Sequence, residues 1–316
     1  MKRKYWMMGL LCSGMVLALS GCGKKKDAEP TPIPTVEPTQ EAAAEPTQEP
    51  DVVEPVSSGE VIPEGMVKSY LTGEYVPEEI GRKRPVAIML NNIYGALPQC
   101  GIDRAGVIYE APAEGGISRL MGIFEDYQDE ERIGSVRSCR DYFISYAMGF
   151  NAIYAHYGQA VYAVPYLDSE EVDNLSGLEQ YGDGITYYRS DDRQAPHNVF
   201  TNYDMLQAGI EAYGYETAYD PAYEGYYQFV PVGERVDLAD GQTASTVKIP
   251  YVSQHPYFTY NAEEEVYYRF QYDEPHVDGN TGEQLTCKNI ILQYSPWQPY
   301  DENGYLNIDT LSLIHI

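Results

Sequence analysis

Two arginines, an aspartate and a histidine gather within residues 133–158, which read IGSVRSCRDYFISYAMGFNAIYAHYG. The guanidinium forks of Arg137 and Arg140 match the geometry of phosphate or carboxylate groups. An imidazole such as that of His156 can move protons near neutral pH. This stretch therefore predicts an anion pocket, with the two arginines as clamps and a histidine as acid or base.

Other polar residues fall at the ends of predicted strands and in loops, where open α/β sheets collect ligands. The candidate ligand-binding residues are Asn92, Glu114, Arg119, Arg137, Arg140 and Asn198, and the catalytic candidates are Asp141, His156 and His197. A purely structural interpretation also stays open. In that interpretation Arg140 and Asp141 pair with neighbours, Arg119 lies on a sheet face, and both histidines are hydrogen-bonded structural residues.

Two further kinds of site have weaker signals. Cys139, His156 and His197 lack the spacing of a zinc site. Glu110 and Glu114 are a conceivable acid pair for glycoside chemistry, but two acids around a Gly-Gly turn arise often by chance. The sequence contains no G-x-S-x-G, H-E-x-x-H, Walker or Rossmann pattern, and no cofactor is predicted.

Short strands and helices must position these residues. Ser138 precedes Asp141 by three residues, the spacing of a helix N-cap, and an apolar stripe follows at 142, 143, 146, 147 and 150. Asn202 is the candidate cap of a second helix over residues 203–213. The predicted strands cover residues 84–92, 106–111, 117–124, 133–136, 152–157 and 186–189.

The second half of the chain is predicted to be β-rich, with strands over residues 227–232, 245–252, 257–260, 266–272 and 288–294. His276 and Asp278 lie beside a strong turn and are expected to be structural or domain-contact residues. The predicted fold class is α+β. A mixed α/β N-terminal domain spans residues 81–213, and a smaller, truncated β-rich domain spans residues 214–310.

The N-terminus predicts the compartment. Residues 1–21 form a lipoprotein signal peptide with a basic start and an apolar centre, and Leu19-Ser20-Gly21-Cys22 resembles a bacterial lipobox. Cys22 would carry the lipid and anchor the protein to the extracytoplasmic face of the cell membrane. Residues 22–80, rich in Pro, Glu and Thr, are predicted to form a disordered tether.

Charge and cysteine content narrow the partners. The formal net charge of −27 argues against nucleic acid as a partner, because a protein that binds nucleic acid needs a basic face. A wall polymer, a peptide or an envelope protein remains a possible partner. Cys100, Cys139 and Cys287 are an odd number, so either one disulfide or three free thiols are compatible with the sequence. The 31 tyrosines suit half-buried sheet positions.

The last six residues, LSLIHI, match the translation of a transposon end used in preparing sequencing libraries. Residues 311–316 are therefore interpreted as a scar, and the natural chain is expected to continue beyond them.

Several blocks in order resemble the YerB-like family of bacterial lipoproteins, built on domain of unknown function 3048. They are RPVAIMLNN, GVIYEAPAEGGISRLMGIF, RIGSVRSCRDYF, FNAIYAHYG and RQAPHNVFTN, followed by YYRFQYDEPHVDGNTGEQL and NIILQ. The resemblance implies an N-terminal domain, a smaller β-rich C-terminal domain and a continuation of some tens of residues. It implies no established activity.

Two functional hypotheses follow. The first is a non-catalytic envelope lipoprotein whose head binds an anionic or wall-associated ligand or partner. The second is a hydrolase or phosphotransferase acting on an anionic envelope substrate. The R-x-x-R-D cluster with FNAIYAHYG is locally similar to LytR-type phosphotransferases, an analogy that concerns the site alone.

Overall fold

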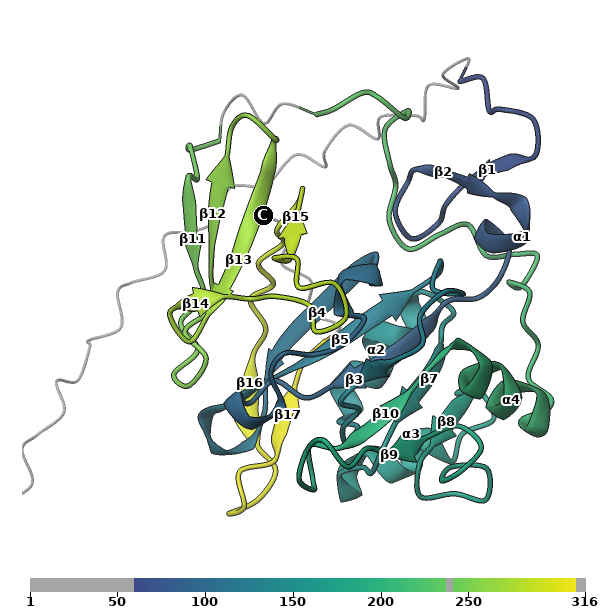
Figure 1. The fold of residues 1–316 in the computed structure, drawn as a ribbon, viewed down its shortest axis with the longest axis vertical. Helices are drawn as coiled ribbons and strands as arrows, with labels where there is room; N and C mark the ends of the chain where they lie inside the picture. The colour runs from purple at the N-terminus through teal and green to yellow at the C-terminus, as the bar shows by residue number, and fades with distance from the viewer. Residues whose placement is uncertain (1–59, 237–240, 311–316) are drawn as a thin grey trace, which may run out of the picture. The chain divides into compact units, whose positions relative to one another are not determined.

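The computed structural model describes residues 60–236 and 241–310. The predicted signal peptide, Cys22, the tether as far as residue 59 and the predicted scar lie outside these residues. Within them, a five-stranded sheet with strand order β4-β5-β3-β7-β8 forms the centre of the fold (Figure 1). Its strands are β3 (Val86–Leu90), β4 (Val107–Pro112), β5 (Ser118–Phe124), β7 (Ile153–His156) and β8 (Asn174–Ser176).

The central sheet is mixed. β5 runs antiparallel to both β4 and β3, whereas β7 runs parallel to β3 and to β8. All five residues of β3 are buried, as expected for a strand with both faces covered. The carboxyl ends of β3 and β7 therefore lie at the same edge of the sheet, the edge at which open α/β sheets bind ligands.

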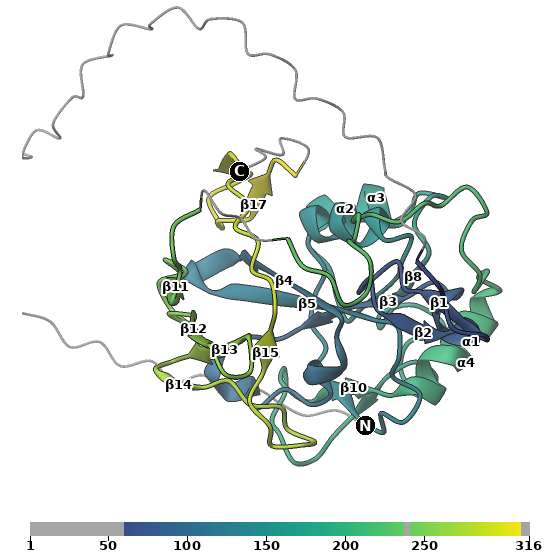
Figure 2. The ribbon, with the colours of Figure 1, turned by 90° about the horizontal axis from the view of Figure 1, so that it is seen from above.

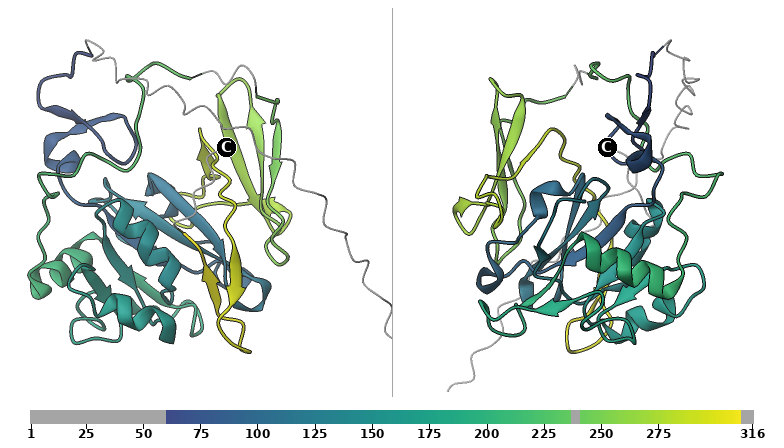
Figure 3. Two further views of the ribbon diagram at one scale, coloured as in Figure 1. Left: turned by 180° about the vertical axis from the view of Figure 1, so that it is seen from behind. Right: turned by 45° about the vertical axis from the view of Figure 1, so that its right-hand side comes forward.

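Helices and a second sheet cover the two faces. Helices α2 (Asp141–Gly149) and α3 (Val164–Leu167) lie on one face, and α4 (Tyr203–Tyr213) lies on the other with β10 (Val199–Thr201) (Figures 2 and 3). Alternate residues of β3 point to the two sides: Ala87 and Met89 pack with α2, whereas Ile88 and Leu90 pack with α4 and β10. This period-two alternation places one core on each side of the sheet.

The remaining elements are small. The second sheet has the order β6-β10-β9, and a third sheet has the order β11-β12-β13-β14, with β15 also pairing β13. Two hairpins, β1-β2 and β16-β17, stand apart from these sheets. The bounds of the elements in these smaller sheets and hairpins, with the short helix α1, are β1 (Met66–Lys68), β2 (Tyr75–Pro77), α1 (Glu78–Gly81), β6 (Ile133–Gly134), β9 (Tyr188–Arg189), β11 (Thr246–Lys248), β12 (Tyr257–Asn261), β13 (Val266–Gln271), β14 (Glu274–Pro275), β15 (Thr286–Cys287), β16 (Trp297–Pro299) and β17 (Leu306–Ile308). Short 3-10 turns are η1 (Tyr94–Ala96), η2 (Ile102–Arg104), η3 (Glu114–Gly116) and η4 (Val161–Ala163).

The α+β fold class is confirmed, and both main helices lie where the apolar pattern placed them. Asn202 caps α4 by accepting a hydrogen bond from the backbone N–H of Met205 at 2.9 Å. The Ser138 cap is wrong. The N-cap of α2 is Arg140, which makes no side-chain cap bond, and the Ser138 hydroxyl instead donates to the Tyr157 carbonyl at 3.3 Å.

Several boundaries also differ from the sequence prediction. Residues 66–81 form β1, β2 and α1, so the folded part begins before the predicted end of the tether. Residues 227–232 and 288–294 form no strand. Both segments carry β-prone residues, but β propensity acts only where a neighbouring strand supplies backbone partners, and the described residues supply none there. Cys100, Cys139 and Cys287 are free thiols in the structure.

Candidate functional site

A short segment, residues 135–139, enters the sheet edge where β3 and β7 end. The backbone N–H of Arg137 donates to the Met89 carbonyl at 2.9 Å, and the Arg137 carbonyl accepts from the N–H of Tyr157 at 3.0 Å. The N–H of Cys139 donates to the Gly158 carbonyl at 2.8 Å. The segment is thus fixed between the two parallel strand ends, and its arginines are held at the edge predicted to bind a ligand.

Three arginines meet at this edge, and we call Arg119, Arg137 and Arg140 the arginine cluster. Arg119 comes from β5 and is only 4% exposed. Its Nη1 donates to the Ser138 carbonyl at 2.6 Å, which brings its guanidinium to the backbone between the other two arginines. Burial, together with the charges of Arg140 and Arg137, lowers the pKa of Arg119 to about 10.

One carboxylate belongs to the cluster. Glu114 accepts two hydrogen bonds from Arg140, from Nε and from Nη2, both at 2.6 Å. Glu114 stands at the start of a tight turn in which Gly115 and Gly116 both adopt left-handed backbone angles. The arginine fork holds the pKa of Glu114 below its ordinary value, against the opposing and largest effect of burial. The bidentate geometry is the strong form of a charged hydrogen bond.

The other two arginines have no carboxylate partner among residues 60–236 and 241–310. Arg137 makes one long contact, from Nη1 to the Pro196 carbonyl at 3.5 Å, and its Nε is buried without an acceptor. Three positive groups and one negative group leave an excess of two positive charges. Since a buried charge without a counterion is costly, this excess needs a functional reason.

His197 lies beside the cluster. The Asn91 amide donates to His197 Nδ1 at 2.7 Å, so the neutral ring carries its proton on Nε2. Burial and the charges of Arg137 and Arg193 lower the pKa of His197. The neutral ring therefore keeps an N–H donor at Nε2.

The structure does not bring the other candidates to this place. His156 is fully buried and both its ring nitrogens face oxygens, the Gly158 carbonyl at 2.9 Å and Asn174 Oδ1 at 3.2 Å. Asp141 accepts a hydrogen bond from the Tyr300 hydroxyl at 2.7 Å. Asn198 bonds Arg189 and the Ser190 carbonyl at strand β9. The surroundings of His156 and Asp141 are those of the structural interpretation that the sequence left open.

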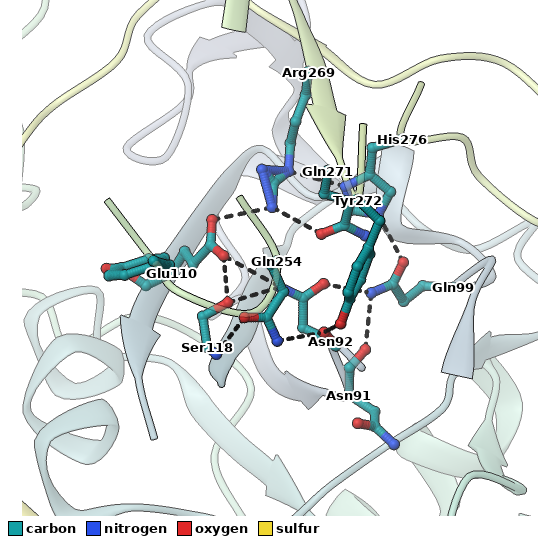
Figure 4. A network of polar contacts seen from close by, with 11 residues as sticks. Asn91, Asn92, Gln99, Glu110, Ser118, Gln254, Arg269, Gln271, Tyr272 and His276 are labelled. Carbon is teal, nitrogen blue, oxygen red and sulfur yellow. Dashed lines mark hydrogen bonds and ion pairs between the residues drawn. The ribbon is translucent and has the colours of Figure 1, made fainter. Parts of the chain in front are cut away.

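A second polar assembly, which sequence analysis missed, joins the central sheet to the sheet of β13; we call it the buried polar network (Figure 4). Arg269 donates from Nη2 to Glu110 Oε2 at 3.0 Å and from Nε to His276 Nδ1 at 2.9 Å. Because the arginine can only donate, His276 must accept at Nδ1 and carry its proton on Nε2. That Nε2–H donates to Gln99 Oε1 at 2.7 Å.

Asn92 lies at the centre of the buried polar network rather than at the arginine cluster. Its side chain accepts from Gln99 and donates to Ser118 Oγ at 2.9 Å, while its carbonyl accepts from Gln254 and Tyr272. The sequence signal that could have revealed this network lies in strand β13. Its buried residues, Arg269 and Gln271, are two positions apart and therefore lie on the same face of the strand. Polar residues at both inward positions of a strand indicate a polar partner surface.

His276 and Asp278 are domain-contact residues, as predicted from the turn. Asp278 Oδ2 accepts from the backbone N–H of Ile102 at 2.6 Å, across the same contact. Glu110 and Glu114, the conceivable glycosidase pair, are each held by a different arginine. No group of three or more His, Cys, Asp or Glu side chains within the described ranges is placed to hold a metal ion.

The neutral state of His276 predicts a pH dependence of stability. Burial, reinforced by the charge of Arg269, lowers the pKa of His276 well below its ordinary value. Below about pH 6.5 the unfolded chain binds a proton that the folded chain excludes. The free energy of unfolding therefore decreases as the pH is lowered, by at most about 1.4 kcal/mol per pH unit. Urea titrations at pH 7.5, 6.5 and 5.5 measure this slope.

The His276→Gln variant separates this slope from the other titrating groups. A glutamine can still accept from Arg269 and donate to Gln99, but it does not titrate. We expect the variant to lose part of the slope below pH 6.5, while His156 and His197, whose pKa values burial also lowers, keep the rest. An unchanged slope would contradict a neutral, buried His276.

Comparison with known proteins defines the class. Residues 71–216 match the family described as "Protein of unknown function (DUF3048) N-terminal domain", and residues 246–312 match the corresponding C-terminal domain. The chain therefore belongs to the DUF3048 family, which confirms the resemblance seen in its sequence blocks.

The chain is similar to a Bacillus subtilis protein in both sequence and structure. The chain is 31% identical over 255 residues to the Bacillus subtilis (strain 168) protein named "Putative lipoprotein YerB", covering 77% of this chain and 72% of that protein. The crystal structure of YerB protein from Bacillus subtilis matches with a TM-score of 0.66 and 30% identity, covering 77% of this chain and 80% of that chain. None of the helices in residues 60–236 and 241–310 is long and apolar enough to cross a membrane.

Proposed function

We propose that this protein is a lipid-anchored envelope protein, attached through Cys22, whose folded head binds an anionic ligand at the arginine cluster. One observation carries the proposal: Arg119 is almost fully buried and has no carboxylate partner among the described residues. The formal charge is −27, yet among the carboxylates of residues 60–236 and 241–310 only Glu114 forms an ion pair within the arginine cluster. A bound anion would compensate the remaining charges.

The hydrolase or phosphotransferase alternative has less support. Acid–base catalysis needs a group that reaches the reacting atom, and His156 is sealed in the core. Asp141 is engaged by Tyr300. Only His197 lies near the arginines, and its Nδ1, the ring atom that could take up a proton, already accepts a hydrogen bond from the Asn91 amide at 2.7 Å. Binding without turnover therefore fits the arrangement better.

Arg137 is the test of this proposal, because it is half-buried at the edge of the cluster and makes only one long contact. We expect Arg137→Ala to weaken the binding of polyphosphate or poly-γ-glutamate about tenfold or more, since a hydrogen bond to a charged group contributes about 1.5–3 kcal/mol. Biolayer interferometry on each immobilised polymer, with neutral dextran as reference, gives the dissociation constants.

The matched control is Arg189→Ala. Arg189 is exposed, and its guanidinium bonds Asn198 and lies over the ring of Tyr157 rather than against the cluster. The acidic chain as a whole repels polyanions, so binding must come from a local basic site. If the two variants lose affinity equally, or if neither polymer binds, the proposal is wrong.

A further inference from the structure

The arginine cluster has more donors than one carboxylate can use. Arg119 uses only Nη1, for the Ser138 carbonyl, which leaves its Nε and Nη2 without an acceptor among the described residues. Arg137 likewise leaves its buried Nε without one. A carboxylate has two oxygens in one plane, and both oxygens of Glu114 accept from the Arg140 fork.

The charge count points to a particular kind of ligand. With the Arg140–Glu114 pair neutral overall, Arg119 and Arg137 leave two positive charges uncompensated. A terminal phosphate carries close to two negative charges at neutral pH and three acceptor oxygens that point in different directions. It can therefore accept from two forks at once.

We propose that the ligand bound at the arginine cluster presents a terminal phosphate group, the dianion of a phosphate monoester, and that Glu114 competes with it for Arg140. This inference rests on the proposed anion site and specifies its ligand class. The Glu114 carboxylate already occupies one fork in the way a ligand oxygen would. Its negative charge also opposes the approach of a dianion.

Glycerol 3-phosphate, dimethyl phosphate and succinate separate the possibilities at pH 7.5. The first is a phosphate dianion, the second a phosphate monoanion, and the third a dicarboxylate of the same charge as the first. Isothermal titration of the purified protein is expected to show glycerol 3-phosphate binding at least tenfold more tightly than the other two. Arg137→Ala should abolish the difference.

Glu114→Gln provides the second arm. The glutamine keeps the size and one acceptor of the side chain but removes its charge, so we expect glycerol 3-phosphate to bind several-fold more tightly. Glu74→Gln is the matched control, because Glu74 is exposed and pairs only loosely with Lys288, at 3.5 Å, and it should leave the affinity unchanged. Thermal unfolding of both variants shows that the fold is retained.

The outcomes separate this inference from the proposed function. If succinate binds as tightly as glycerol 3-phosphate, and Arg137→Ala weakens both, the anion site stands and the phosphate assignment is overturned. A weaker affinity of folded Glu114→Gln for glycerol 3-phosphate would overturn the competition by Glu114. If none of the three anions binds in a way that depends on Arg137, both the inference and the proposed function fail.

Discussion

Replacing Arg269 with alanine is expected to lower the free energy of unfolding by about 3–5 kcal/mol, the usual cost of removing one partner of a buried ion pair. Arg269 is 5% exposed and donates to Glu110 and His276. Without it, the Glu110 carboxylate loses its charged partner, and the Nδ1 atom of His276 loses its only donor among the described residues. Both groups are enclosed between two sheets, so water cannot easily replace the lost bonds.

Urea unfolding followed by tyrosine fluorescence and by circular dichroism measures this loss. Arg235→Ala is the matched control, since Arg235 pairs with Glu265 where both side chains are about two-thirds exposed. Exposed pairs contribute about 0–1 kcal/mol, so the control should remain close to the parent protein. A loss below about 1 kcal/mol for Arg269→Ala would mean that the buried polar network does not hold the two sheets together.

Replacing Arg119 with methionine is expected to separate stability from binding. Methionine has a similar length and no charge, so the folded state no longer carries a buried cation without a counterion. We expect the free energy of unfolding to stay within about 1 kcal/mol of the parent value or to rise, because the lost bond to the Ser138 carbonyl offsets part of the gain. Binding of glycerol 3-phosphate should weaken by about 10- to 100-fold.

The same protein preparations serve both measurements, by urea titration and by isothermal titration. Arg189→Met is the control, as an exposed arginine that lies outside the cluster. If Arg119→Met lowers the free energy of unfolding by more than about 2 kcal/mol and leaves binding unchanged, Arg119 is a structural residue. In that case the buried charge would be compensated by the protein itself.

The two predictions concern opposite solutions to the same physical problem. Arg269 and Arg119 are both buried arginines on strands that face a polar surface. Arg269 forms an ion pair with Glu110, whereas Arg119 forms no ion pair among the described residues and donates to a backbone carbonyl, with the charge of Glu114 acting on it from a greater distance. The first arrangement is typical of a structural contact, and the second is the one that leaves capacity for a ligand.

The sequence by itself determined the local features of this fold. The apolar stripe after Asp141 and the Asn202 cap depend on residues three or four positions apart, and helices α2 and α4 form where these patterns placed them. The proximity of Arg137 and Arg140 follows in the same way, because both lie on one short segment. The ordered sequence blocks also determined the family, since their combination is specific even though no single block is.

Only the tertiary structure decided which polar residues are compensated. Arg119 reaches Ser138 because β5 and residues 135–139 both flank β3, a contact made across 19 positions of the chain. Arg269 reaches Glu110 across 159 positions, and the buried His156 reaches Asn174 across 18 positions. Burial and counterions depend on which distant segments pack together, and short-range spacing carries no information about that packing. The sequence therefore located the arginines, and the packing decided that Arg119 and Arg137 form no ion pair among the residues that the structure describes.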